Sequence, residues 1–337
     1  MRRRAGVLAG QRCGVPLIGD ESLSRRPMRR VIAPLRQMGA DISAAEGDTP
    51  PLTLRPVPAL HGIDYVLPMA SAQVKSCLLL AGLYAQGRTC VTEPAPTRDH
   101  TERMLAAFGR PVQRDGARVC IQGGAAPLTA TSFAIPGDIS SAAFPLVAAL
   151  IAGEGELLIE NVGVNPTRTG ILDILRAMGA DIELLNPRQA GAEPVADLRV
   201  RASALRGIAV PPELVPLAID EFPAIAVAAA CANGETLITG AEELRVKESD
   251  RIAAIANGLA ALGIAVEALA DGLRIQGGQF RGGVVDSHGD HRIAMAFSLA
   301  ALRAAAPVRI RDCVNVGTSF PGYVELMRGL GLGITVA

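Results

Sequence analysis

The chain has 337 residues, of which 49% are hydrophobic, and this is enough for about two domains with buried cores. Aromatic residues make up only 3% of the chain and Trp is absent, so Ala, Val, Leu and Ile must fill these cores. Basic and acidic residues number 33 each, a balance that argues against a nucleic-acid partner or a membrane partner, although it leaves room for a local basic pocket.

The cysteines and histidines do not follow the spacing of metal sites or of disulfide-rich domains. There is no C-x-x-C pair, and the four histidines are not at zinc-ligand spacing. We therefore expect a reduced cytoplasmic protein with neither a disulfide framework nor a metal site. The apolar stretch after Met1–Arg4 is too short for a signal peptide, and no apolar run reaches the length of a membrane span. The six cysteines are Cys13, Cys77, Cys90, Cys120, Cys231 and Cys313.

Five glycines each follow a helical apolar pattern and precede a short run of strand type. The clearest copies are residues 35–42 (LRQMGADI) and residues 175–182 (LRAMGADI). Glycine is favoured just past a helix C-terminus because the chain turns there through positive φ. Each of these glycines therefore predicts a helix before it and a strand after it. They are Gly39, Gly109, Gly179, Gly263 and Gly331.

A second recurring pattern is a small-residue helix that leads into a strand, with strands expected at residues 13–18, 88–92, 155–159, 235–238 and 307–310. Each repeat then reads strand, loop, apolar helix, strand, charged loop, amphipathic helix, strand and a further strand. Such a repeat is too long for common solenoid units and indicates a small α/β module used several times. The first repeat differs, because residues 1–10 already correspond to the apolar helix; either the chain starts within a module or the first repeat is degenerate.

Charged residues gather in the loops of every repeat, where helix N-termini favour anions. In the loop at residues 20–27, Pro27 suits the first turn of a helix. Asp290 precedes an apolar helix that it could cap. Several Arg and Lys side chains in such loops predict a ligand with more than one phosphate or carboxylate group.

One charged segment, residues 244–251, places Lys247 and Arg251 four residues apart on one face of an expected helix, with Glu248 beside Arg251. A solvated ion-pair network explains this group equally well. Asp220 lies between apolar runs, so we expect its carboxylate to be partly buried and to need a partner.

Only two of the 33 basic residues are lysines, Lys75 and Lys247. In a chain this rich in arginine, a remaining lysine is a candidate for a site that needs a compact ammonium group. For Lys75, in the middle of an expected helix, chance is an equally good explanation.

Six segments together resemble the enolpyruvyl transferases of the EPSP synthase family. They occur in the family's order and extend over the whole chain. The chain has no P-loop pattern, which would indicate nucleotide binding, and no G-x-S-x-G pattern, which would indicate a serine nucleophile. The segments are Ser24–Met28 (SRRPM), Ala70–Ser76 (ASAQVKS), Arg98–Glu102 (RDHTE), Arg245–Arg251 (RVKESDR), Asp290–Met295 (DHRIAM) and Thr318–Pro321 (TSFP).

The resemblance implies an α/β protein with a two-domain enolpyruvyl transferase-like fold, built from βαβαββ modules of which the first is incomplete. Residues 1–136 would form one domain with one partial and one complete module, and residues 137–337 a second domain with three modules. The implied reaction transfers the enolpyruvyl group of phosphoenolpyruvate to the 5-hydroxyl of shikimate 3-phosphate, in the pathway to the aromatic amino acids. No metal or organic cofactor is implied, and the family is usually monomeric.

The resemblance also assigns roles to residues. Asp220 and Glu248 would move protons, and Arg2, Asp290 and His291 would support the site. Phosphoenolpyruvate would be bound by Arg26, Gln73, Arg251 and Arg292. Shikimate 3-phosphate would be bound by Ser71, Ala72, Gln73, Arg98, Asp220 and Lys247.

Two departures and two alternatives accompany this interpretation. The family's amino-terminal Lys-Ser…Arg and Asn-x-Gly-Thr loops have no counterpart, so we expect this chain to have little or no activity alone. Thr318 lies where some members have Lys. One alternative is the related UDP-N-acetylglucosamine enolpyruvyl transferase, but Cys90 and Cys120 have the neighbours of strand residues and not of that family's loop cysteine. The other is a non-catalytic remnant that binds an anionic substrate or nothing.

Overall fold

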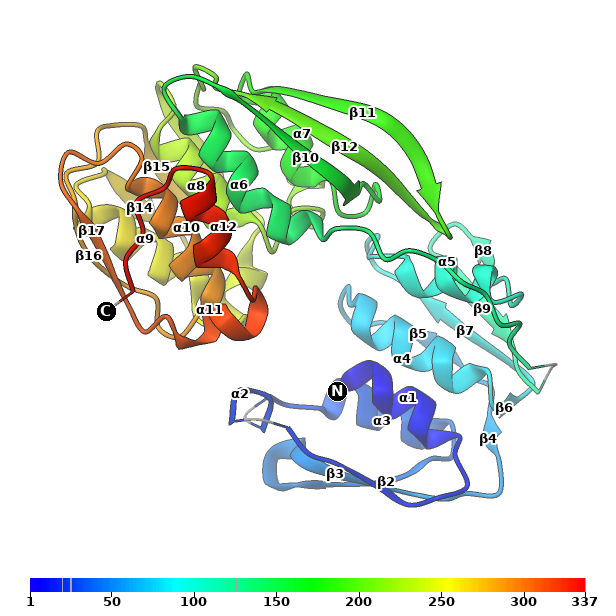
Figure 1. Cartoon of the computed structure of the whole chain (residues 1–337). Coiled ribbons are helices and arrows are strands. Elements are labelled where there is room, and N and C mark those ends of the chain that lie inside the picture. Colours follow the sequence, from blue (N-terminus) through cyan, green and yellow to red (C-terminus); the bar gives the residue numbers. More distant parts are fainter. Residues whose placement is uncertain (20, 25, 125–126, 337) are drawn as a thin grey trace. The chain divides into compact units, whose positions relative to one another are not determined.

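A computed structural model describes residues 1–19, 21–24, 26–124 and 127–336 (Figure 1). The chain divides into two compact units, Met1–Phe133 and Ala134–Ala337, called here the first and the second unit. Asp20 and Arg25 of the first charged loop lie outside the described residues. In the described part of the chain, no helix combines the length and the apolar character needed to cross a membrane.

In the first unit, the helices α1 and α4 pack against each other, and both contact α3. Gly6 of α1 permits this approach, since a Cβ there would lie 2.1 Å from the carbonyl oxygen of Cys77 in α4. The helices are α1 (Arg2–Ala9), α2 (Glu21–Ser24), α3 (Arg29–Gln37), α4 (Ala72–Gly82) and α5 (His100–Ala107), with a 3₁₀ turn η1 (Glu46–Asp48).

Three sheets accompany these helices in the first unit. One is antiparallel with the order β1-β3-β2, the second is the parallel pair β4-β6, and the third has the order β5-β7-β9-β8, in which only β5 and β7 are parallel. The strands are β1 (Val15–Leu17), β2 (Asp41–Ala45), β3 (Thr49–Arg55), β4 (Leu60–His61), β5 (Asp64–Val66), β6 (Ala85–Gln86), β7 (Arg88–Thr92), β8 (Gln113–Asp115) and β9 (Arg118–Gln122).

The second unit contains the apolar helices α6, α8 and α10, which contact one another. All nine residues of α8 are buried, and Ala and Val make up most of them, as the low aromatic content predicts. The helices are α6 (Ile139–Ile151), α7 (Gly170–Ala177), α8 (Phe222–Ala230), α9 (Arg251–Ala261), α10 (His291–Ala300), α11 (Val314–Ser319) and α12 (Tyr323–Gly329), with 3₁₀ turns η2 (Pro212–Leu214) and η3 (Glu242–Val246).

Its sheets repeat one arrangement. Two are antiparallel with the orders β10-β12-β11 and β13-β15-β14, and the third is the parallel pair β16-β17. Parallel bridges Gly137–Val162 and Ala209–Leu237 span α6 and α8 in the same way that the pair β16-β17 spans α10. The strands are β10 (Glu156–Gly163), β11 (Asp181–Ala190), β12 (Glu193–Arg201), β13 (Glu235–Ile238), β14 (Val266–Ala268), β15 (Leu273–Gln276), β16 (Gly283–Asp286) and β17 (Val308–Arg311).

The predicted repeat is confirmed in most of its parts. All five repeat glycines have φ between 75° and 96°, and strands β2, β8, β11 and β14 follow the first four. The fifth expected strand is wrong, because residues 332–336 after Gly331 form no strand. Helices alternate with parallel and antiparallel strands in both units, so the expected α/β fold class is confirmed.

Two further expectations are wrong. Pro27 is not in a helical turn, because α3 begins at Arg29 after its N-cap residue Met28. The expected absence of disulfides also fails, since Cys90 and Cys120 form one. These two cysteines are directly opposite each other on the antiparallel strands β7 and β9, a pairing that depends on strand register and not on sequence spacing. Their predicted location in strands is confirmed.

Candidate active site

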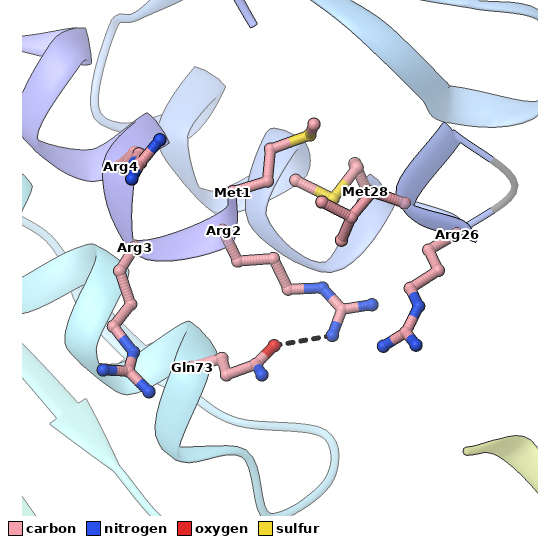
Figure 2. Close-up of a pocket in the computed structure, with 8 residues that line it drawn as sticks. Met1, Arg2, Arg3, Arg4, Arg26, Met28 and Gln73 are labelled. Carbon is pink, nitrogen blue, oxygen red and sulfur yellow. Dashed lines mark hydrogen bonds between the residues drawn. The ribbon is translucent and has the colours of Figure 1, made fainter. Parts of the chain in front are cut away.

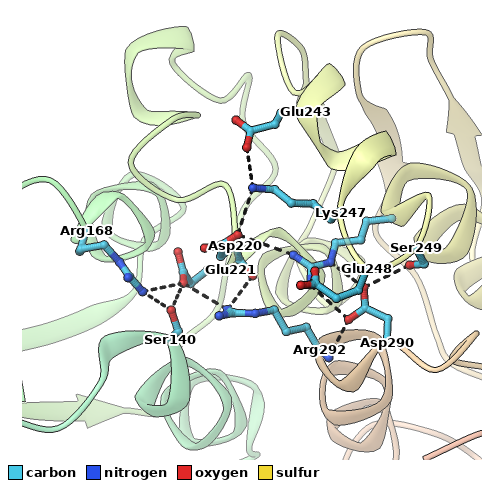
Figure 3. A network of polar contacts seen from close by, with 11 residues as sticks. Ser140, Arg168, Asp220, Glu221, Glu243, Lys247, Glu248, Ser249, Asp290 and Arg292 are labelled. Carbon is cyan, nitrogen blue, oxygen red and sulfur yellow. Dashed lines mark hydrogen bonds and ion pairs between the residues drawn. The ribbon is translucent and has the colours of Figure 1, made fainter. Parts of the chain in front are cut away.

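In the second unit, charged side chains meet at the N-termini of α8, α9 and α10 (Figure 3). Asp220 and Glu221 directly precede α8, Lys247 and Glu248 lie between η3 and α9, and Asp290 caps α10. Helix N-termini favour anions, so basic side chains at the same place strengthen this preference.

Arg251, the first residue of α9, is almost completely buried and is held by Asp290. Its Nε donates to Asp290 Oδ2 at 2.7 Å and its Nη2 donates to Asp290 Oδ1 at 3.2 Å. Burial by itself lowers the pKa of Arg251, but the hydrogen bonds and charge of Asp290, with Glu248 and Asp220, raise the pKa above its usual value. Arg251 is therefore a permanently charged group in a fixed orientation.

The sequence suggested that Lys247 and Arg251 lie on one helix. In the structure they do not, because α9 begins at Arg251. η3 ends at Val246, and Lys247 has an extended ψ of −147°, so the chain turns between the two residues. The Nζ of Lys247 nevertheless lies 3.3 Å from Asp220 Oδ1 and 2.7 Å from Glu243 Oε1. Tertiary packing, and not helical periodicity, brings Lys247 to the site.

The two carboxylates assigned to proton transfer differ in environment. The side chain of Asp220 is 15% exposed and lies 3.3 Å from Lys247 Nζ and 3.7 Å from Arg251 Nη1. The expectation of a partly buried Asp220 with a partner is thus confirmed. Glu248 is more exposed and accepts a hydrogen bond from Arg251 Nη2 at 2.8 Å, in the predicted i, i+3 relation.

Arg292 reaches the same cluster from the first turn of α10. Its backbone N–H donates to Asp290 Oδ1 at 2.9 Å, which confirms the predicted cap. Its Nη1 donates to the carbonyl oxygen of Asp220 at 2.9 Å and to Glu221 Oε1 at 3.4 Å. Burial lowers the pKa of the neighbouring His291.

Glu221, Arg168 and Ser140 belong to this cluster but were not among the predicted site residues. The buried Glu221 Oε1 accepts a hydrogen bond from Ser140 Oγ and lies 3.6 Å from Arg168 Nη2, in addition to its bond with Arg292. A carboxylate directly before the apolar helix α8 was a usable signal for Glu221. Arg168 and Ser140 carried no such signal, because only the fold brings the β10–α7 loop and α6 to Glu221.

In the first unit, Arg2, Arg26 and Gln73 line a pocket of about 300 Å³ (Figure 2). Arg2 Nη1 donates to Gln73 Oε1 at 2.7 Å, and the guanidinium groups of Arg2 and Arg26 share the space in front of Gln73. Burial first, and then the charges of Arg30 and Arg26, lower the pKa of Arg2. The pocket is also lined by Met1, Arg3, Arg4, Leu23 and Met28.

Ser71, Ala72 and Arg98 occupy helix termini of the same unit. Ser71 is the N-cap of α4 and its Oγ accepts from the N–H of Val74 at 3.4 Å, while Ala72 is the first helical residue. Arg98 is half-buried and stands two residues before α5. The sequence therefore identified helix N-termini correctly at both places.

The chemistry available is that of fixed cations with nearby carboxylates. Guanidinium and ammonium groups bind phosphate and carboxylate, and a carboxylate beside them can accept or return a proton. Among the residues that the structure describes, no three His, Cys, Asp or Glu side chains are grouped as a metal site would require.

Comparisons with known proteins identify the family of this chain. The model of the family "EPSP synthase (3-phosphoshikimate 1-carboxyvinyltransferase)" matches residues 1–327. The 3-phosphoshikimate 1-carboxyvinyltransferase of Methylococcus capsulatus is 64% identical over 337 residues, which are 100% of this chain and 77% of that protein. The enzyme of the same name from Alkalilimnicola ehrlichii is 64% identical over 336 residues, 99% of this chain and 75% of that protein.

Solved structures lead to the same family. EPSP synthase from Acinetobacter baumannii has a TM-score of 0.91 and 51% sequence identity, covering 100% of this chain and 78% of that chain. The UDP-N-acetylglucosamine alternative is not favoured, because these relatives carry the other name. The chain belongs to the EPSP synthase family of 3-phosphoshikimate 1-carboxyvinyltransferases.

Proposed function

We propose that the residues of this chain bind shikimate 3-phosphate and phosphoenolpyruvate and transfer the enolpyruvyl group to the 5-hydroxyl, with release of phosphate. One observation carries the proposal: the carboxylate of Asp220 is held half-buried between Lys247 and Arg251, beside the exposed carboxylate of Glu248. This arrangement combines fixed positive charge for anionic ligands with two carboxylates of different exposure.

In the second unit, Lys247 and Asp220 are assigned to shikimate 3-phosphate, and Arg251 and Arg292 to phosphoenolpyruvate. The fixed orientation of Arg251 on Asp290 supports its assignment, because a preorganised guanidinium loses little freedom on binding. Asp290 and His291 support the site from α10. Glu221 positions Arg292 by accepting a hydrogen bond from its guanidinium group.

In the first unit, Ser71, Ala72, Gln73 and Arg98 are assigned to shikimate 3-phosphate. Arg26, with Gln73, is assigned to phosphoenolpyruvate, and Arg2 supports Gln73 by its hydrogen bond. The shared pocket and the lowered pKa of Arg2 support these assignments. Burial first, and then the charges of Arg30 and Arg26, disfavour the charged guanidinium group, and a bound anion would offset both effects.

Asp220 and Glu248 are assigned to the proton transfers. The 5-hydroxyl loses its proton as its oxygen bonds to C2 of the enolpyruvyl group, while C3 gains a proton. The intermediate then loses a proton from C3 and the C2–O bond to phosphate breaks, so that the double bond forms again. Positioned carboxylates typically contribute about 10²- to 10⁴-fold to such transfers. The proposal also includes that the reaction needs no cofactor and that the protein is monomeric and cytoplasmic.

Phosphate release tests the proposal. The purified chain is given phosphoenolpyruvate with shikimate 3-phosphate, or with UDP-N-acetylglucosamine as the comparison substrate, and ligand binding is measured by calorimetry in parallel. We expect the chain to bind shikimate 3-phosphate. Where turnover is detected, Asp220→Asn should lower the rate of phosphate release by about 10²-fold or more. Asp173→Asn, an exposed control on α7, should leave that rate unchanged. Binding without turnover supports the non-catalytic alternative, and absence of binding contradicts the proposal.

A further inference from the structure

Lys75 is completely buried in α4, although a lysine ammonium group is costly to remove from water. Its Nζ lies 3.0 Å from Glu93 Oε2 and 2.6 Å from Glu102 Oε1. Both carboxylates are themselves buried. Arg114, on β8, approaches the same two oxygens at 3.4 and 3.5 Å, so two positive and two negative charges balance.

These contacts join separate parts of the first unit. Glu93 directly follows β7 and accepts a hydrogen bond from Thr97 Oγ1, whereas Glu102 is in the first turn of α5. A second link between α4 and α5 is the hydrogen bond from Thr101 Oγ1 to Ser76 Oγ, at 2.7 Å. Lys75 therefore connects α4 to both ends of the segment 93–102.

The residues assigned to shikimate 3-phosphate lie next to these connections. Gln73 is two residues before Lys75 on α4, and Ser71 caps that helix. Arg98 directly follows Thr97, which is bonded to Glu93. A single buried ammonium group thus stands between the element that carries Ser71 and Gln73 and the segment that carries Arg98.

We propose that Lys75 is a positioning residue for the phosphorylated substrate: by bridging Glu93 and Glu102 it fixes Arg98 relative to Ser71 and Gln73. The substrate's identity in this inference rests on the proposed function. An ammonium group suits the place because it is compact and donates in three directions, which allows one side chain to hold two carboxylates from different elements.

The alternative is that Lys75 only stabilises the fold, and two variants separate the possibilities. Lys75→Met leaves the buried Glu93 and Glu102 with Arg114 alone, so both stability and binding should fall. Lys75→Met combined with Glu102→Gln restores the charge balance but not the bridge between α4 and α5. We expect this double variant to recover most of the lost thermal stability while its Kd for shikimate 3-phosphate stays roughly 10- to 100-fold above that of the unmodified chain.

A matched control is Ile42→Ala, which shortens a buried apolar side chain on β2 in the same unit. It should lower the melting temperature and leave the Kd unchanged. Recovery of the Kd together with stability in the double variant would show a purely structural role and overturn the inference.

Hydrogen exchange of the ligand-free chain provides a readout that does not depend on substrate identity. We expect faster exchange of the backbone amides between residues 93 and 99, where Pro94 and Pro96 carry none, in the double variant, with little change in β2 and β3. If the unmodified chain does not bind shikimate 3-phosphate, the proposed function fails, while faster exchange at residues 93–99 still supports positioning by Lys75. Unchanged exchange there contradicts it.

Discussion

Asp290 holds Arg251 through two parallel hydrogen bonds, of 2.7 and 3.2 Å, in a place where both side chains are at most 1% exposed. The same carboxylate accepts hydrogen bonds from Ser249 Oγ and from the backbone N–H of Arg292. One aspartate thus caps α10 and orients the first residue of α9.

Asp290→Asn should therefore lower the free energy of unfolding strongly. The amide keeps the shape but removes the Asp290 charge, so that Glu248 and Asp220 are the acidic partners left to the buried Arg251 among the described residues. Breaking one partner of a buried pair typically costs about 3–5 kcal/mol. Urea unfolding measures the effect. Glu235→Gln is the control, because Glu235 pairs with Arg274 at the surface and should change stability by no more than about 1 kcal/mol. Equal effects of the two variants would show that the Arg251 pair contributes no more than a surface pair.

Lys247→Met should weaken the binding of shikimate 3-phosphate. Lys247 is 17% exposed and contacts Asp220, so its ammonium group is partly desolvated and available to a ligand. Hydrogen bonds to charged groups contribute about 1.5–3 kcal/mol, which corresponds to a loss of roughly 10- to 100-fold in Kd by calorimetry. Glu243→Gln removes the other carboxylate near Lys247 and should leave the Kd within a few-fold. A strong effect of Glu243→Gln alone would mean that Lys247 is positioned by Glu243 and not by Asp220.

Asp197 should make the second unit sensitive to acid. The N–H of Asn161 first, and then the side chains of Asn186 and Arg188, lower the pKa of Asp197 from 3.8 to about 2. Because the folded-state pKa is lowered, the stabilisation is fully present above pH 3.8 and is lost as the pH falls toward 2. Unfolding measured between pH 5 and pH 2 should show a smaller loss for Asp197→Asn than for the unmodified chain. Parallel pH curves for the two would contradict this assignment.

The pair Cys90 and Cys120 should be detectable by thiol titration. In denaturant without reductant we expect four reactive thiols, the free cysteines Cys13, Cys77, Cys231 and Cys313, and six after reduction. A link across 30 residues stabilises a fold by about 3–4 kcal/mol in the chain-entropy treatment, so reduction should lower the melting temperature. Cys90→Ala should melt at the temperature of the reduced protein. Six reactive thiols before reduction would contradict the disulfide between Cys90 and Cys120.

The sequence by itself determined the module and the places where its charges gather. Glycine is required wherever a helix ends in positive φ, as at Gly39 and Gly179, and this requirement is local, so it can be read from the chain. Asp290 before an apolar helix and Asp220 between apolar runs were recognisable for the same reason: capping and burial depend on neighbouring residues.

Only the tertiary structure decided which of these charges meet. Lys247 reaches Asp220 through the turn after η3 and not along a helix, and Lys75 meets Glu93 and Glu102 across three elements. Cys90 faces Cys120 because of strand register. Such contacts join residues that are distant in the chain. The packing of helices and strands sets the distances between them, and the number of residues that separates them in the sequence does not predict these distances.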